Sequence, residues 1–143
     1  MCGEFAEQHG IQVDFTHENV PRFVPSDVAL CLFRVAQEGL RNVRRHSGAS
    51  RAEVRLDGAE QAISLSIVDK GKGFDSHALP ARTGLGIRSM QERLRLLGGR
   101  FEIRSQPGEG TVIYVSVPLA VNPSHSSSGP AIPQDQEDTY AKL

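Results

Sequence analysis

The chain contains little cysteine, no tryptophan and no long apolar run. Of its 143 residues two are cysteines, one at position 2 and the other, Cys31, inside an apolar stretch. Such a pair makes neither a disulfide framework nor a Cys/His metal site. No run approaches the roughly 20 apolar residues that a membrane helix needs, and the N-terminus lacks the layout of a secretory signal. We therefore expect a cytoplasmic chain, free or as the cytosolic part of a membrane-anchored protein, that itself makes no membrane contact.

The motifs of several enzyme classes are also absent. The sequence contains neither the P-loop pattern G-x-x-x-x-G-K-[ST] nor a G-x-G-x-x-G inside a strand–helix–strand unit. It lacks the G-x-S-x-G nucleophile elbow and the metal-binding H-E-x-x-H. A formal net charge of -1 argues against nucleic-acid binding through bulk charge. Basic residues nevertheless outnumber acidic ones in residues 34–120, which favours either an anionic ligand or an arginine-rich solvated surface.

Residues 1–120 have the size and pattern of one domain. Alternation predicts a short strand over 11–15, and apolar residues at helical spacing predict a helix that ends near His46. Either Ser26 or Asp27 can cap the start of that helix. Residues 121–143 are rich in Ser, Pro and other polar residues, and we expect them to form a disordered tail.

The rest of the domain predicts four more strands and a second helix. Strands at 52–56 and 62–69 are joined by the turn signal Asp57-Gly58, a helix follows at 87–97, and strands at 100–105 and 111–118 flank the turn QPGEG. The order contains no internal repeat and no regular alternation of strands and helices. It predicts an α+β fold, a two-layer α/β sandwich with a mixed, mostly antiparallel sheet covered on one face by helices.

Polar side chains gather along the first predicted helix. At 100° per residue, Glu38, Asn42 and Arg45 fall within about a 60° arc at the edge of the apolar stripe. A carboxylate can take a proton, an amide oxygen suits Mg²⁺, and a guanidinium can hold phosphate. The same row also fits an ordinary solvated face. His46 falls at the angle of the apolar stripe near the helix end. It fits a packed residue, a histidine that compensates the dipole at the C-terminal end of the helix, or a ligand role.

The sequence also contains three glycine clusters. In Asp69-Lys70-Gly71-Lys72-Gly73-Phe74 the glycines allow a close backbone approach, and Asp69 is able to accept a hydrogen bond from an amine such as that of adenine. Thr83-Gly84-Leu85-Gly86 opens the second helix, where unpaired N–H groups favour anions. Gly108-Glu109-Gly110-Thr111 fits a hairpin. Each cluster alone also fits a simple turn or helix start.

The order and spacing of the four clusters are more specific than any one of them. R-V-A-Q-E-G-L-R-N-V-R-R-H, D-K-G-K-G-F, G-L-G-I-R-S-M-Q-E-R-L and G-E-G-T resemble the N box and the three glycine boxes of the GHKL ATPase superfamily. The phrasing is similar to the catalytic and ATP-binding domain of sensor histidine kinases of the nitrate-sensor and DesK-like type. The resemblance covers residues 10–119 and implies a Bergerat-type ATP-binding fold.

The resemblance implies roles for individual residues. Asn42 would hold Mg²⁺ between the phosphates, Glu38 would be the base or polarising group, and Arg45 and His46 would approach the nucleotide. Asp69 would bind the adenine amino group in a pocket shaped by Gly71 and Gly73, with Thr111 supporting the adenine through its hydroxyl or a water. The third set, Gly84, Leu85 and Gly86, would bring backbone amides to the triphosphate beside a short lid at 75–83. Arg45 and Gly39 depart from the Lys and Ala frequent at these positions.

The same resemblance implies a protein histidine kinase domain that binds Mg-ATP and transfers the γ-phosphate to a histidine. Kinases of this type carry that histidine on a dimerising helical hairpin upstream, which this chain does not show, so the acceptor would lie on another domain, with a response regulator downstream. No nucleic-acid partner is expected. A stand-alone regulator of the anti-sigma serine-kinase kind, with the same fold, is the alternative.

Overall fold

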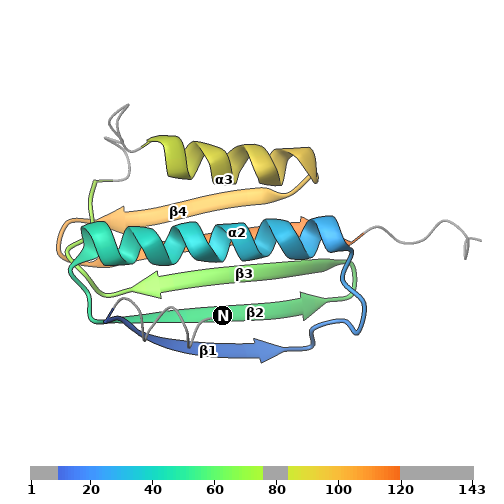
Figure 1. Ribbon diagram of the computed structural model, residues 1–143, viewed down its shortest axis with the longest axis horizontal. Coiled ribbons are helices and arrows are strands. Elements are labelled where there is room, and N and C mark those ends of the chain that lie inside the picture. Colours follow the sequence, from blue (N-terminus) through green and yellow to red (C-terminus); the bar gives the residue numbers. More distant parts are fainter. Residues whose placement is uncertain (1–9, 76–83, 120–143) are drawn as a thin grey trace, which may run out of the picture.

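The computed structural model describes residues 10–75 and 84–119, and at Gly84 and Leu85 it describes only the helical backbone (Figure 1). Within these ranges the chain forms a five-stranded sheet and two long helices. In chain order the elements are β1 (Gln12–Glu18), α2 (Ser26–Asn42), η1 (Val43–Ser47), β2 (Arg51–Ala59), β3 (Ala62–Asp69), α3 (Gly84–Leu96), β4 (Arg100–Gln106) and β5 (Gly110–Pro118).

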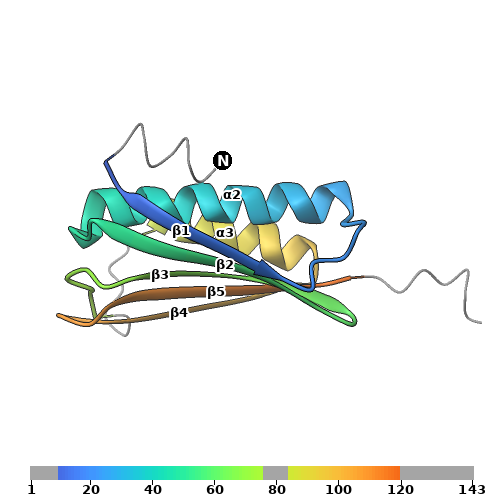
Figure 2. The ribbon, with the colours of Figure 1, turned by 90° about the horizontal axis from the view of Figure 1, so that it is seen from below.

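The sheet has the strand order β1-β2-β3-β5-β4. Only the β1–β2 pair is parallel, and the other three pairs are antiparallel. Both helices lie on the same side of this sheet, as the edge-on view shows (Figure 2). The predicted α+β sandwich with a mostly antiparallel sheet is therefore confirmed. The expected tail at 121–143 and most of the expected lid lie outside the described residues.

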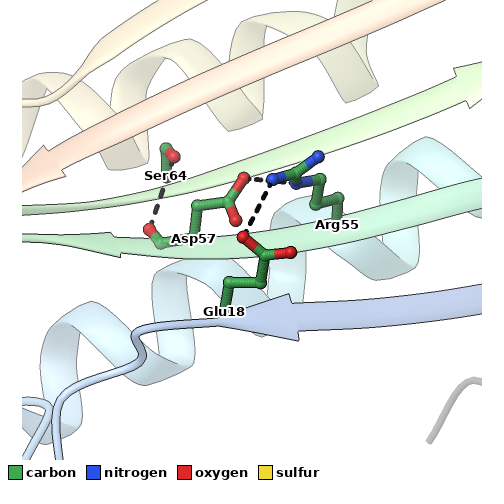
Figure 3. A network of polar contacts seen from close by, with 4 residues as sticks. All are labelled: Glu18, Arg55, Asp57 and Ser64. Atoms are coloured by element: carbon green, nitrogen blue, oxygen red, sulfur yellow. Dashed lines mark hydrogen bonds and ion pairs between the residues drawn. The ribbon is translucent and has the colours of Figure 1, made fainter.

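The core fills the space between the two layers. Every second residue of β3 points toward the helices, as its alternating burial shows. The same alternation in β5 supplies Ile113, Val115 and Val117, which pack with Leu40 of α2 and Met90 of α3 in one buried cluster. The outer face of the sheet carries charged and polar side chains together with the exposed Val112 and Tyr114. There the guanidinium of Arg55 contacts Glu18 on β1 and Asp57 on its own strand (Figure 3).

Helix α2 starts without the predicted side-chain cap. Pro25 is the N-cap residue, no side chain caps the first turn, and Ala29 N–H donates instead to the Pro25 carbonyl at 2.9 Å. Asp27 Oδ1 accepts a hydrogen bond from the adjacent Val28 N–H at 2.8 Å. The helix continues to Asn42 and then widens into one π-helical turn, η1, that ends at Gly48 with φ of 69°. The left-handed conformation favours glycine at this stop.

The turn between β2 and β3 lies three residues beyond its predicted place. Ala59 pairs with Ala62, so Glu60 and Gln61 form the loop, while Gly58 pairs with Ile63 inside the hairpin. The prediction of a turn at Asp57-Gly58 was wrong because this glycine serves a different purpose. A Cβ at Gly58 would overlap the Asn19 carbonyl, so glycine allows the loop after β1 to pass directly over the strand.

No described helix is both long enough and apolar enough to cross a membrane.

Candidate functional site

A row of polar side chains crosses three strands at one end of the sheet. Asp69 on β3 pairs with Thr111 on β5, and Thr111 pairs with Ser105 on β4. Paired residues point to the same face of a sheet, and Asp69 and Ser105 are both 5% exposed. We call Asp69, Thr111 and Ser105 the polar row. The next row inward is apolar, with Ile67 opposite Ile113, so the polar row marks the boundary between core and site.

Residues 70–74, which we call the glycine loop, are held at both sides by hydrogen bonds. Asp69 Oδ1 accepts from Gly71 N–H at 2.8 Å, and Lys72 N–H donates to the Ser47 carbonyl at 2.8 Å. On the opposite side Gly108 N–H donates to the Lys72 carbonyl at 2.6 Å. Phe74 N–H donates to Ser105 Oγ at 2.9 Å. The loop therefore joins the end of η1 to the β4–β5 hairpin.

Two glycines of this loop are required by their surroundings. A Cβ at Gly71 would overlap the carbonyl and lie 2.6 Å from the hydroxyl oxygen of Ser47. Gly73 has φ of 61°, and a Cβ there would overlap the carbonyl of Gln106. Close approach explains the first glycine, and both close approach and a left-handed backbone explain the second. The two glycines let the loop pass close to Ser47 of η1 on one side and to Gln106 of β4 on the other.

The polar side chains of α2 lie at the same end of the molecule. In Figure 1 the C-terminal end of α2, the end of β3 and the start of α3 all lie together at one side. Glu38 keeps 24% of its side chain exposed and forms an ion pair with Arg41 at 3.6 Å. Asn42 is half-buried. The structure thus brings Glu38 and Asn42 to the end of the sheet that carries the polar row.

The π-helical turn changes the direction of the side chains after Asn42. An ideal α-helix extended through His46 predicts that residue at the apolar stripe, but Arg45 and His46 are both exposed and Ser47 is buried instead. The wider turn rotates the later residues relative to α-helical spacing. The interpretation of His46 as a packed residue was therefore wrong. The turn also brings the Ser47 carbonyl to the glycine loop.

The start of α3 meets Glu38. A Cβ at Gly86 would overlap Glu38 Oε1, so the backbone of this first helical turn lies directly against the carboxylate. Helix α3 begins at Gly84, and the side chain of Leu85 lies outside the described part of the chain. A helix start with unpaired N–H groups is an anion-binding feature. The structure therefore places Gly86, from the cluster that opens the second helix, beside Glu38 of α2.

Sequence reasoning missed Ser47 and Ser105. Both are buried, and both bond the glycine loop. A signal for Ser105 was available, because pairing across the predicted QPGEG turn puts Ser105 opposite Thr111. Ser47 had no comparable signal, since its position depends on the π-helical turn.

Other candidate features contribute little to this site. A hollow of about 330 Å³ is lined by Glu102, Arg104, Val112 and Tyr114, which alternate with the core residues of β4 and β5 and therefore lie on the outer face. Among the described residues, no three Asp, Glu, His or Cys side chains come together as a metal site.

Comparison with known proteins agrees with this geometry. The sequence profile of the histidine kinase-, DNA gyrase B- and HSP90-like ATPase family matches residues 27–121, which includes α2, the glycine loop, α3 and the polar row. The chain belongs to this family. The match confirms the resemblance to the GHKL superfamily and, at the level of the family, ATP binding.

Two curated relatives are named as histidine kinases. The chain is 37% identical over 115 residues to the signal transduction histidine-protein kinase/phosphatase DegS of Brevibacillus brevis, covering 80% of this chain and 30% of DegS. It is 34% identical over 124 residues to the sensor histidine kinase MctS of Rhizobium johnstonii, covering 85% of this chain and 27% of MctS. This chain spans less than a third of each relative. Neither relative is named as an anti-sigma regulator.

Solved structures show the same fold. The histidine kinase domain of the Erythrobacter litoralis blue-light activated histidine kinase matches with a TM-score of 0.65 at 21% identity, covering 82% of this chain and 57% of the other. The Acinetobacter baumannii histidine kinase AdeS matches with a TM-score of 0.66 at 16% identity, covering 83% of this chain and 59% of that one.

Proposed function

We propose that this chain is the ATP-binding catalytic domain of a sensor histidine kinase and transfers the γ-phosphoryl group of ATP to a histidine on another domain. The observation that carries the proposal is the polar row. Asp69 lies at the end of a buried strand, beside a glycine loop fixed on both sides, in a family of ATPases whose named relatives here are histidine kinases.

The adenine end of the site consists of the polar row and the glycine loop. Asp69 Oδ1 is occupied by Gly71 N–H, whereas Oδ2 has no hydrogen-bond partner within residues 10–75 and 84–119. A carboxylate oxygen accepts an amino group and repels a carbonyl oxygen. Asp69 therefore binds the adenine amino group, Gly71 and Gly73 give the ring access to the backbone, and Thr111 supports the same edge.

The phosphate end consists of α2, η1 and the start of α3. Mg²⁺ is usually held by one or two protein oxygens together with substrate phosphates, and the amide oxygen of Asn42 fits that donor set. Asn42 makes no side-chain hydrogen bond within the described residues, so its amide is available. When bound, Mg²⁺ supplies charge neutralisation at the phosphates. Arg45 and His46 approach the phosphates from η1, while backbone amides at Gly84, Leu85 and Gly86 approach from α3.

Phosphoryl transfer depends mainly on positioning and charge stabilisation. Glu38, one turn before Asn42, polarises the attacking group or accepts its proton. The acceptor is a histidine on a dimerisation domain of the same kinase, and the phosphoryl group passes on to a response regulator. The domain works in the cytoplasm.

The test for the phosphate end is magnesium linkage. We expect the wild-type chain to bind a fluorescent ATP analogue more tightly with Mg²⁺ than with EDTA, and Asn42→Ala to lose most of this gain while keeping its magnesium-free affinity. Gln37→Ala is the matched control, because Gln37 is a half-buried amide on the same helix whose Oε1 accepts from Arg34 at 3.1 Å. No nucleotide binding by folded wild type, or an unchanged magnesium effect in Asn42→Ala, would contradict the assignment.

The test for the transfer step uses a histidine-containing dimerisation domain supplied in trans with radiolabelled ATP. The proposal predicts acid-labile label on that domain. It predicts a loss of about 100-fold or more in the transfer rate for Glu38→Gln, as expected for removing a proton-transfer group. Label that appears equally fast with Glu38→Gln would exclude this role of Glu38.

A further inference from the structure

Ser105 is the third member of the polar row and has no part in the proposed contacts to the nucleotide. Its hydroxyl oxygen lies at the centre of three contacts. It accepts from Phe74 N–H at 2.9 Å, it donates to the Gly110 carbonyl at 2.8 Å, and it lies 2.9 Å from Thr111 Oγ1. The residue is 5% exposed, so these protein contacts take the place of water.

A count of protons fixes the direction of the third contact. A serine hydroxyl has one proton to donate and two lone pairs. The proton goes to the Gly110 carbonyl, and one lone pair receives Phe74 N–H. Only a lone pair is left for Thr111, so the Thr111 hydroxyl must donate its proton to Ser105. Thr111 then has no proton for a ligand and presents only lone pairs.

We propose that Ser105 is a positioning residue that turns Thr111 into a hydrogen-bond acceptor and thereby selects 6-aminopurine nucleotides over 6-oxopurine ones. This inference rests on the proposed function and deepens it. An acceptor at Thr111 matches the amino group of adenine and opposes the carbonyl of hypoxanthine or guanine.

The position of Ser105 supports a role in selecting the nucleotide base rather than in packing alone. Thr111 pairs with Asp69 on its other side, so the polar row presents two acceptors in sequence along one edge. The same Ser105 oxygen also fixes Phe74, the last residue of the glycine loop. One hydroxyl therefore links the strand that bears Thr111 to the loop that lies beside Asp69. Hydrogen bonds in such a network reinforce one another in a buried setting.

The experiment compares affinities for ATP and inosine triphosphate, which differ only at the 6-position and its adjacent ring nitrogen. Wild type is expected to prefer ATP. Ser105→Ala releases the Thr111 proton, which can then turn to an oxo group, so ATP affinity should fall about 3- to 10-fold while inosine triphosphate affinity stays the same or rises. The ratio of the two affinities is the readout, because a general loosening of the site would weaken both nucleotides alike.

Two further variants keep the test independent of folding. Ser105→Thr retains the hydroxyl and should restore the wild-type ratio. In a Thr111→Val background Ser105→Ala should leave the ratio unchanged, because no threonine proton remains to be directed. Ser64→Ala is the matched control, since Ser64 Oγ donates to the Asp57 carbonyl at 3.4 Å on the outer face of the sheet. All variants are compared as folded proteins by circular dichroism and thermal melting.

The outcomes separate the two proposals. No ATP binding by folded wild type contradicts the proposed function itself. Selective ATP binding by wild type with an unchanged ratio in Ser105→Ala, or a changed ratio in Ser64→Ala, overturns the role of Ser105 and leaves the proposed function standing.

Discussion

At the scale of single residues, the contact between Gly86 and Glu38 joins α3 to the polar side chains of α2. The atom that a Cβ on Gly86 would overlap is the end of a flexible side chain. The carboxylate can therefore swing aside at little cost in stability, but it then leaves the position in which the wild-type backbone holds it.

Gly86→Ala is therefore expected to separate stability from activity. Alanine favours a helix over glycine by up to about 1 kcal/mol, so thermal unfolding should occur at the same or a higher temperature. Phosphoryl transfer to a dimerisation domain supplied in trans should slow by at least about tenfold because Glu38 is displaced. Ser89→Ala, an exposed position on the same helix, is the control. A stable variant with full transfer activity would show that the Glu38 position is unimportant.

The buried thiol of Cys31 leads to a prediction about the pH dependence of stability. Burial raises the pKa of this thiol above its ordinary value of 9.0, more than nearby Arg93 lowers it. Because the folded-state pKa is raised, the stabilising contribution is fully present below the unfolded pKa and is lost as pH rises above 9.0. The free energy of unfolding should thus fall with alkaline pH in wild type, and Cys31→Ala should fall less steeply in urea titrations between about pH 7 and 10. Cys2 is present in both proteins and cancels. Equal slopes would contradict the prediction.

The type and spacing of a residue determine whether the sequence alone can identify it as part of the site. Asp69 and Asn42 stand in spacings that suggest chemistry, and the structure brings them to one end of the molecule, although their roles remain proposals. Ser105 has the appearance of an ordinary polar strand residue. Its importance comes from the pairing with Thr111 and the contact with Phe74, which exist only once the hairpin and the glycine loop are folded together.

At the scale of elements, the end of α3 shows why the helix stops where it does. Gly98 N–H donates to the Arg95 carbonyl at 3.1 Å, and Gly99 N–H donates to the Leu94 carbonyl at 2.7 Å. Gly98 has φ of 68°, so this is a Schellman stop with glycine in the left-handed position. The helix thus ends at Leu96, one residue before the end of the helix predicted at 87–97.

Gly98→Ala should destabilise the fold without affecting the site. A Cβ there meets only Pro118 Cγ at 3.7 Å, an ordinary contact, so the expected cost of about 1–2 kcal/mol comes from the left-handed backbone. Gly98→Asn should cost less, because asparagine tolerates this conformation. Urea unfolding gives the free energies, and nucleotide affinity of the folded proteins should not change. An alanine variant as stable as wild type would contradict this account of the stop.

Elements also show where sequence patterns mislead. Asp57-Gly58 has the composition of a hairpin turn, but Gly58 is needed where the loop at Asn19 passes close to the strand. The turn forms instead at Glu60 and Gln61. The helix through His46 was predicted at constant α-helical spacing, and η1 interrupts that spacing. At Gly58 a tertiary contact outweighs local sequence preference.

At the scale of the whole molecule, the site depends on elements far apart in the chain. The Ser47 carbonyl, the Lys72 backbone and Gly108 N–H form one continuous set of hydrogen bonds, which links η1, the glycine loop and the β4–β5 hairpin. Alternation and helical periodicity were sufficient to predict the two layers, because burying one face of each element leaves few arrangements. The strand order was beyond such patterns, since the parallel β1–β2 pair forms across the whole length of α2.

Truncation from the C-terminal end tests where the folded domain ends. Removal of residues 121–143 should leave the melting temperature and nucleotide affinity unchanged, as their composition predicts no contribution to a core. Removal from Val117 onward should lower stability strongly, because Val117 is fully buried and Leu119 N–H donates to the Gln61 carbonyl at 2.8 Å. Thermal melts of the two truncated chains decide the point, and a large loss in the shorter deletion would place the boundary further along the chain.

The most direct measurement is calorimetric titration of the chain with non-hydrolysable ATP and GTP analogues in the presence of Mg²⁺. We predict binding selective for adenine in wild type. Asp69→Asn should weaken ATP binding by at least about tenfold, because an amide can still accept Gly71 N–H but then turns its amino group toward that of adenine. Asp57→Asn, on the outer face (Figure 3), should bind as wild type does. Equal affinity for the two analogues, or full ATP affinity in Asp69→Asn, would contradict the assignment of the polar row as the adenine site.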